Sequence, residues 1–181
     1  FVIAMILNAT AGRYVDRKSS VAVPDLILDN IPTVNLSFFF IYGFITVLII
    51  FFAYPLFFRV RELHIAISQF SLLVLLRSFF ISLTHLSPPV NALAYNFPER
   101  LAILDFKNAL FFSGHTAIPF LGYWLYRKEK IGIFFLAATV VLAATVLFMH
   151  VHYSIDVFAA LFITYGSYRI GKWLFRRVNG N

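Results

Sequence analysis

The chain of 181 residues contains no cysteine, and only 13% of its residues are charged. The absence of cysteine excludes disulfides and thiolate chemistry, and it gives no reading of the redox compartment. Soluble domains carry about 25% charged and about 45–50% apolar residues, whereas this chain is 61% hydrophobic and 19% aromatic. A composition so poor in charge predicts an all-α, polytopic membrane protein.

Apolar runs recur along the chain at lengths that suit a bilayer, which a helix crosses in about 20 residues. We expect complete spans at 36–58, 64–84, 107–126 and 131–150, and a fifth, partly amphipathic span at 153–175. Residues 1–11 are predicted to be the end of a further span whose first part lies upstream. No linker interrupts this series, so residues 1–181 are predicted to form one domain, a six-helix membrane bundle with a truncated first helix.

Charge is distributed unevenly between the connections that join these spans. The net charge is +7. Nine basic residues lie near the short connections and the C-terminal tail: Arg59, Arg61, Arg127, Lys128, Lys130, Arg169, Lys172, Arg176 and Arg177. The long connections carry fewer basic residues, largely offset by acidic ones. The positive-inside rule therefore places the short connections in the cytoplasm and the long ones on the opposite face. Anionic lipid is a sufficient partner for this charge, so no nucleic acid is expected.

Two short polar motifs flank the run 134–149, which has no charge at all. The first is Ser113-Gly114-His115-Thr116, and the second is the segment 152–156, His-Tyr-Ser-Ile-Asp. The helix that begins near His115 crosses the membrane away from this face, and the next span, 131–150, returns to it before His152. Both motifs are therefore expected at the non-cytoplasmic face. Ionisable side chains are costly in lipid and are usually kept for function. The motifs therefore predict an active site.

The spacing within the second motif predicts a catalytic pair. His152 and Asp156 are four residues apart, which places them one turn apart on one face of a helix. A carboxylate in that position accepts the imidazole N–H, fixes the tautomer and leaves the other nitrogen free. One imidazole would attack phosphorus, and the second, that of His115, would protonate the leaving oxygen. Gly114 would let backbone N–H groups approach an anion at a helix N-terminus.

Arg77 lies deep in the apolar run 64–84. A buried arginine needs an anion, and a phosphate is one hypothesis. The other is that the side chain snorkels to a polar cavity.

These motifs resemble those of sphingomyelin synthase-type members of the lipid phosphatase (type 2 phosphatidic acid phosphatase) superfamily. That family has Ser-Gly-His-Thr before the fourth of six spans and His-Tyr-[Ser/Thr]-x-Asp-Val opening the sixth, which match 113–116 and 152–157 here. The stretch 77–89 is similar to the family's arginine, threonine and leucine–proline pattern at the end of the third span. Val23-Pro24-Asp25, followed by Asp29, is similar to a segment of its first outer loop.

The resemblance implies that His152 is the nucleophile, Asp156 its partner and His115 the other catalytic histidine. It implies transfer of a phospho-headgroup from a membrane phospholipid donor to ceramide or diacylglycerol through a phosphohistidine, with no cofactor. With water as acceptor, the activity would be that of a lipid phosphatase or a phospholipase C-like hydrolase. The non-enzymatic alternative is a lipid-binding or transport protein. A homo-oligomer is compatible with the sequence.

A metal site is a further alternative, because His115, His150, His152 and Asp156 include ligand types that suit zinc. The resemblance argues for metal-free chemistry.

The chain also departs from the family pattern. It has no Lys-x6-Arg-Pro motif and no basic residue in 144–149, so Arg77 is the candidate phosphate ligand, with Lys107 and Arg100 next. Ser113, Gly114 and Thr116 are the other predicted substrate-binding residues. Val151 and Ala109 stand where the sphingomyelin synthase branch has acidic residues, which leaves Asp105 as the nearest candidate partner for a cationic headgroup.

Overall fold

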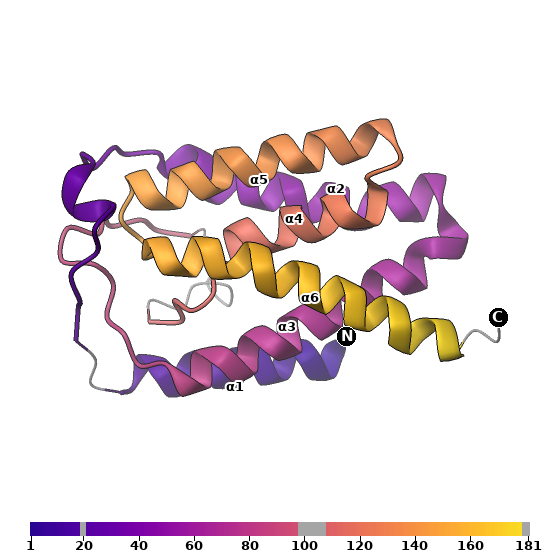
Figure 1. The fold of residues 1–181 in the computed structure, drawn as a ribbon, viewed down its shortest axis with the longest axis horizontal. Helices are drawn as coiled ribbons and strands as arrows, with labels where there is room; N and C mark the ends of the chain where they lie inside the picture. The colour runs from indigo at the N-terminus through magenta and orange to yellow at the C-terminus, as the bar shows by residue number, and fades with distance from the viewer. Residues whose placement is uncertain (19–20, 98–107, 179–181) are drawn as a thin grey trace.

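The computed structural model describes residues 1–18, 21–97 and 108–178. Within these residues, six α-helices run along the long axis of one bundle (Figure 1): α1 (Val2–Asp16), α2 (Phe44–Phe58), α3 (Leu63–Leu83), α4 (Gly114–Tyr126), α5 (Lys130–Phe148) and α6 (Ser154–Val178). Shorter helical pieces are η1 (Leu28–Asn30), the π-helix η2 (Phe39–Gly43) and η3 (Val60–Glu62). In the described residues the only β-type pairing is one bridge between Val21 and Leu86. The predicted all-α class is confirmed.

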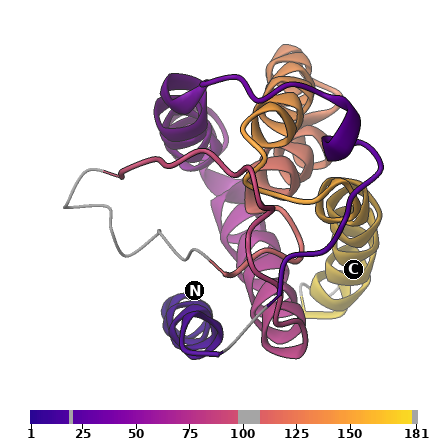
Figure 2. The same ribbon diagram turned by 90° about the vertical axis from the view of Figure 1, so that its left-hand side faces the viewer.

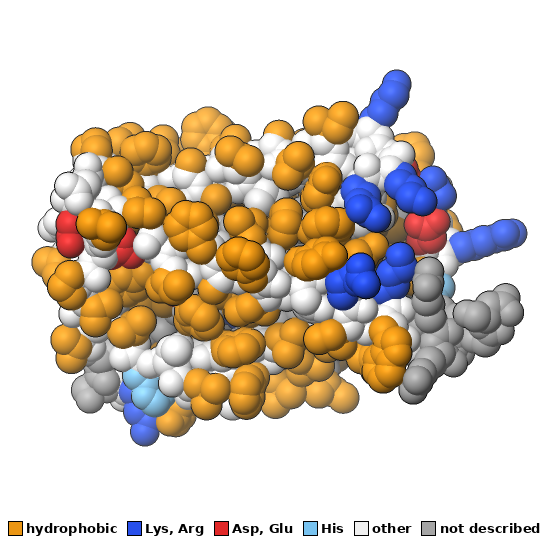
Figure 3. All heavy atoms as spheres, in the orientation of Figure 1, with side chains coloured by type: hydrophobic (Ala, Val, Ile, Leu, Met, Phe, Trp, Pro, Cys, Tyr) orange, Lys and Arg blue, Asp and Glu red, His pale blue; other side chains and the backbone are white. Residues whose placement is uncertain are grey.

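Three of the described helices are long and apolar enough to cross a membrane: Phe39–Phe58, Val60–Leu83 and Lys130–Phe148. Each ends within a few residues of the bounds expected from the sequence. Their outer surfaces expose large apolar side chains such as Phe57, Phe79 and Ile133. Figure 3 shows apolar side chains covering the length of the bundle, with most of the basic ones gathered at one end. These features indicate a membrane protein.

Helix α4 is shorter than expected, so the predicted helical span 107–126 is wrong in its first part. Residue 107 lies outside the described residues, and residues 108–113 form no helix. Neighbouring helices hold this segment, because Arg77 of α3 donates to the carbonyl oxygens of Ala109 and Phe112, and the Ser113 N–H donates to the Asp156 carbonyl oxygen. The 13 residues of α4 rise about 20 Å, less than the roughly 30 Å of a bilayer core.

The first and last helices also differ from the three apolar ones. Helix α1 continues past the predicted end at residue 11 to Asp16 and packs along α3. Helix α6 is 25 residues long and packs on α4 and α3, but it carries several basic residues in its second half.

Helix α4 lies at the centre of the bundle and presents His115 at its first turn. It packs against α5 and α6, and most of its side chains are buried. Gly122 makes this close approach possible, because a Cβ there would lie 2.5 Å from the Phe135 ring of α5. Small residues at helix contacts are typical of membrane bundles. The central helix therefore fixes where His115 stands.

The two ends of the bundle are built differently. The long connections lie together at one end, called here the outer end (left in Figure 1), where Val21 and Leu86 form their bridge. The view onto this end shows them crossing over the helix termini (Figure 2). The short connections between α2 and α3 and between α4 and α5 lie at the other end, called here the inner end, where Arg59 contacts Glu62 and Glu129.

Candidate active site

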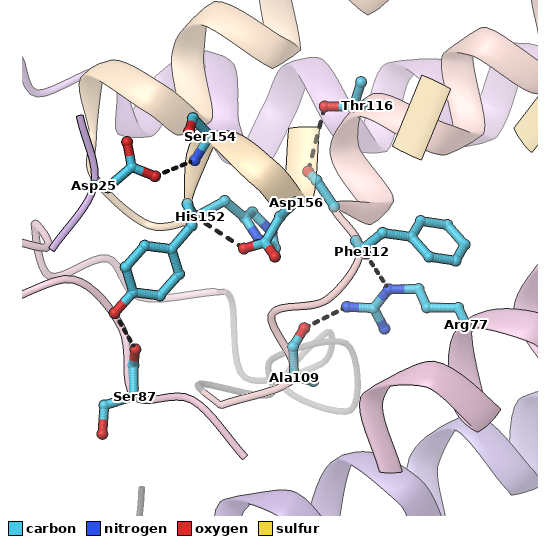
Figure 4. A network of polar contacts seen from close by, with 11 residues as sticks. Asp25, Arg77, Ser87, Ala109, Phe112, Thr116, His152, Ser154 and Asp156 are labelled. Atoms are coloured by element: carbon cyan, nitrogen blue, oxygen red, sulfur yellow. Dashed lines mark hydrogen bonds and ion pairs between the residues drawn. The ribbon is translucent and has the colours of Figure 1, made fainter. Parts of the chain in front are cut away.

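His152 lies in the turn between α5 and α6 and is paired with Asp156. The Asp156 Oδ2 atom is 3.3 Å from Nδ1 of His152 and accepts the Tyr153 N–H at 2.9 Å (Figure 4). The predicted contact is present, but it does not join two residues stacked on one helix face, because α6 begins only at Ser154. Instead, the carboxylate in the first turn reaches back to the residues before the helix, as in a capping box.

This contact determines which nitrogen of the His152 ring carries the hydrogen. A carboxylate only accepts hydrogen bonds, so Nδ1 carries the hydrogen and Nε2 keeps its lone pair. Asp156 is fully buried, and among the described residues its Oδ1 atom has no hydrogen-bond partner. Its charge acts on the guanidinium of Arg77. The pair therefore offers one oriented nitrogen backed by a buried negative charge.

Two outer connections hold the turn that carries His152. The Asp25 Oδ2 atom accepts the Ser154 N–H at 2.7 Å, while Oδ1 accepts the N–H groups of Ile27 at 2.9 Å and Leu28 at 3.1 Å. Burial raises the pKa of Asp25, but these hydrogen bonds together outweigh it and hold the pKa below its ordinary value. Asp25 is therefore ionised at neutral pH, which strengthens its bonds to these three N–H groups.

The next residue, Tyr153, ties the same turn to both connections. Its hydroxyl accepts the Val23 N–H at 3.1 Å and donates to the Ser87 carbonyl oxygen at 2.9 Å. Burial raises the pKa of Tyr153, so the hydroxyl keeps the hydrogen that it donates. Asp25 and Tyr153 were not among the site residues expected from the sequence, yet they hold the backbone directly after the nucleophile candidate.

His115 is held by an aromatic stack and a backbone carbonyl. Its ring lies between Phe40 and Phe44, with centroid distances of 4.1 Å on both sides. Its Nε2 atom is 3.1 Å from the Phe40 carbonyl oxygen. Because a carbonyl only accepts, Nε2 carries the hydrogen and Nδ1 is left for proton exchange. Phe40 belongs to the π-helix η2, an element that is frequent at functional sites.

Arg77 uses part of its guanidinium to hold neighbouring segments. Nε donates to the Phe112 carbonyl at 3.1 Å, Nη2 to the Ala109 carbonyl at 2.6 Å and Nη1 to Oδ1 of Asn8 at 3.3 Å. A guanidinium has five N–H donors, so one on each Nη atom is not engaged by these bonds. Arg77 therefore combines an anchoring role with the capacity to bind an anion.

One cavity brings the main candidates together. It has a volume of about 260 Å³, and Arg77, Gly114, His115 and His152 all line it. Gly114 leaves room beside the guanidinium, since a Cβ there would lie 3.5 Å from the Nε atom of Arg77. The rest of the lining is largely apolar. Two imidazoles, each with one nitrogen oriented, therefore share a mainly apolar cavity with a cation.

Two other predicted substrate-binding residues, Ser113 and Thr116, do not line this cavity. The hydroxyls of Ser113 and Thr116 lie 3.3 Å apart, and both side chains are fully buried beside the cavity rather than in it. Arg100, Asp105 and Lys107 lie outside the described residues. Of the Ser-Gly-His-Thr motif, the glycine and the histidine face the cavity, while the hydroxyl residues bond to each other at the helix start.

The zinc alternative would need several ligands at one point. Among the described residues, no group of three or more His, Cys, Asp or Glu side chains could hold a metal ion. His150 is buried, has a left-handed backbone with φ of 54°, and lines a different cavity together with Asp25. It is therefore separated from the cavity that His115 and His152 share.

Sequence reasoning also missed residues that line this cavity. Asn8 of α1, together with Tyr95 and Phe97 of the second long connection, lines its outer part. Asn8 interrupts an apolar run as Arg77 does, and that signal could have found it. The two aromatic residues lie in a connection without regular structure, so no periodic pattern marked them.

No protein-family model, curated protein or solved structure matches this chain. The functional inference therefore depends on the residues and on their geometry. The arrangement places an imidazole with a fixed tautomer, a second imidazole and a guanidinium in the lining of one cavity, and these are groups that a phosphoryl transfer can use.

Proposed function

We propose that the chain is an integral-membrane phosphotransferase similar to the sphingomyelin synthase branch of the type 2 phosphatidic acid phosphatase superfamily. It moves a phospho-headgroup from a glycerophospholipid to ceramide or diacylglycerol. One observation carries this proposal: His115, His152 and Arg77 line a single cavity whose other walls are mainly apolar. The polar groups suit a phosphodiester, and the apolar walls suit the lipid that carries it.

In the first half-reaction, Nε2 of His152 attacks the phosphorus atom of the donor. The bond between phosphorus and the glycerol oxygen breaks, and the Nδ1 atom of protonated His115 gives its proton to that oxygen. The unengaged N–H donors of Arg77 stabilise the charge on the non-bridging oxygens. Asp156 stabilises the positive charge that develops on the His152 ring. The products are diacylglycerol and a phosphohistidine.

In the second half-reaction, the acceptor hydroxyl attacks the same phosphorus atom. His115, now neutral, takes the hydroxyl proton at Nδ1, and the N–P bond to His152 breaks. Both histidines then return to their starting states. If water takes the place of the lipid hydroxyl, the same steps give hydrolysis, so only the acceptor separates a transferase from a hydrolase.

Product analysis tests the proposal directly. Purified protein in nanodiscs is incubated with headgroup-labelled phosphatidylcholine and phosphatidylethanolamine, with ceramide, with diacylglycerol or with neither. We expect label on one of the two acceptor lipids and, after rapid quenching, acid-labile label on His152. Label only in the aqueous phase would identify a hydrolase. No transfer and no covalent label would favour the lipid-binding or transport alternative.

The proposal includes six membrane-crossing segments with the active site on the non-cytoplasmic face. Because the chain has no cysteine, single cysteines can report the topology. Val90 is 88% exposed in the second long connection, and Lys128 is exposed in a short one. A membrane-impermeant maleimide should label Val90→Cys from outside and Lys128→Cys only after permeabilisation. The reverse pattern would place the chemistry in the cytoplasm.

A further inference from the structure

The catalytic cavity extends inward from the histidines between three helices. Each helix contributes side chains at spacings of three or four residues, which share one helix face. The members are Phe1, Met5 and Asn8 of α1 with its flank, Phe44, Leu48 and Phe52 of α2, and Phe70, Val74 and Arg77 of α3. The cavity is therefore a channel along the helix axes rather than a shallow hollow at the outer end.

The polarity of this channel changes along its length. At the outer level, Arg77 bonds to Asn8 and Phe44 stacks on His115. At the inner level, the rings of Phe1, Phe52 and Phe70 meet, with centroid distances of 5.9 Å, 5.9 Å and 5.1 Å. Met5, Leu48 and Val74 lie between these two levels. A polar mouth leads to an apolar passage with an aromatic floor.

The depth of the passage follows from the helix geometry. Arg77 and Phe70 are seven residues apart on α3, so the floor lies about 10 Å below the guanidinium, room for roughly eight carbons of an extended alkyl chain. The cavity volume of about 260 Å³ suits one such chain rather than two. A group that binds here must be narrow and apolar, and it must be attached to something polar at the mouth.

We infer that the inner part of this cavity binds the first segment of one alkyl chain of the lipid substrate, and that Phe52 and Phe70 set the length of chain that gains binding energy. This inference takes the identity of the substrate from the proposed function. Burial of each further methylene is favourable until the chain meets the aromatic floor. Carbons of a longer chain that do not fit within that depth lie outside the channel and add little binding energy.

The first test measures how kcat/KM depends on acyl length. Donors with butanoyl, hexanoyl, octanoyl and palmitoyl chains are compared for the full chain and for two variants. Val74→Phe fills the middle of the passage, and Phe70→Leu deepens its floor. Phe135→Leu is the matched control, because Phe135 is an equally buried phenylalanine on α5 that does not line the cavity.

We expect kcat/KM of the unmodified chain to rise up to about the octanoyl donor and then to level off. Val74→Phe should lower the ratio of kcat/KM for the octanoyl donor to kcat/KM for the butanoyl donor by about 10-fold. Loss of the space for one or two methylene groups changes discrimination by about that much. Phe70→Leu should move the plateau to longer chains, and Phe135→Leu should leave the profile unchanged. One profile shared by all four proteins would overturn the inference.

The second test needs no turnover. The His152→Ala variant is photolysed with phosphatidylcholine that carries a diazirine either beside the ester or halfway along one acyl chain. We expect the mid-chain probe to mark residues 48–52 and 70–74. Marking confined to the outward faces of α5 and α6 would overturn the inference, even if the unmodified chain forms a phosphohistidine. Marking inside the cavity without any phosphohistidine would uphold the tail site and reject the proposed function.

Discussion

The outer and inner ends of the bundle treat charged groups in opposite ways. At the outer end Arg77, His152 and Asp156 lie within the protein, each with fixed hydrogen-bond partners. At the inner end Arg59 bonds to Glu62 at 3.1 Å and to Glu129 at 2.9 Å, with side-chain exposures of 45%, 43% and 20%. Exposed pairs contribute little to stability, whereas buried charge is costly to desolvate. The outer end therefore buries its charged groups among fixed partners, which the proposed chemistry would use, and the inner end leaves its charged groups partly exposed.

The largest effect is expected at His152, the proposed nucleophile. His152→Ala removes the attacking nitrogen and should reduce transfer by about 10³-fold or more. The matched control is His64→Ala, which removes an exposed histidine at the inner end and should leave turnover unchanged. Radiolabel transfer with both folded variants in nanodiscs checks this. Substantial residual turnover in His152→Ala would mean that another group attacks phosphorus.

The next effect depends on the donor. His115→Gln keeps an N–H that can donate to the Phe40 carbonyl but removes the nitrogen that exchanges a proton. Turnover of the natural donor should fall by about 10²–10⁴-fold, the usual contribution of general acid–base catalysis. The loss should be much smaller with a p-nitrophenyl phosphodiester, whose leaving group needs no proton. Equal losses with both donors would assign His115 to binding.

Asp156→Asn tests the buried carboxylate. The amide oxygen can still accept the Tyr153 N–H, but the charge that stabilises the imidazolium is lost, so kcat should fall by about 10²-fold or more. Asp29→Asn, an exposed carboxylate at the same end, is the control and should have no effect. If both variants match the unmodified chain, Asp156 serves only the helix start.

Arg77→Lys separates anion binding from anchoring. Lysine keeps the charge but cannot form the planar fork, so kcat/KM should fall by about 10-fold or more. Asn8→Ala removes one anchoring partner of Arg77 and leaves the guanidinium, so its loss should be several-fold smaller. Inhibition by inorganic phosphate gives a readout besides turnover: it should weaken in Arg77→Lys. Unchanged inhibition would leave Arg77 with its anchoring role alone.

The smallest effect is expected at the inner end. Glu129→Gln removes the ion pair with Arg59 and changes the hydrogen bond with Tyr54. Turnover should be unchanged, and the free energy of unfolding should fall by less than about 1 kcal/mol. Thermal unfolding at low and high salt measures this. A large loss of activity would show that the inner end influences the cavity at the outer end, and would contradict the separate roles of the two ends.

The sequence predicts the elements that depend on hydropathy and misses those that depend on contacts between helices. The apolar runs located α3, α5 and the continuous helix formed by η2 and α2 (Phe39–Phe58) within a few residues. The predicted start of the helix at 107 was wrong, because hydropathy does not reveal that Arg77 donates hydrogen bonds to the carbonyl groups of Ala109 and Phe112. The same limit concealed Phe40, whose contribution to the site is a backbone oxygen.

The candidate site shows the same division. The ionisable residues His115, His152 and Asp156 stood out because lipid-embedded runs rarely contain them. The contact between His152 and Asp156 was expected from helical spacing, yet it forms through a carboxylate that reaches back across the start of α6. Asp25, by contrast, reaches the site from 127 positions before His152, a distance that no local pattern spans.

The π-helix η2 changes the helical register of the residues that precede α2. A π turn holds one residue more than the turn of an α-helix, so it rotates the preceding residues by about 100° relative to an uninterrupted helix. Phe40, whose carbonyl oxygen and ring both hold His115, lies in this turn. Deleting one residue from 39–43 would restore the α-helical register and turn Phe40 away from the imidazole. The length of this turn, as well as the identity of its side chains, therefore determines whether Phe40 can contact His115.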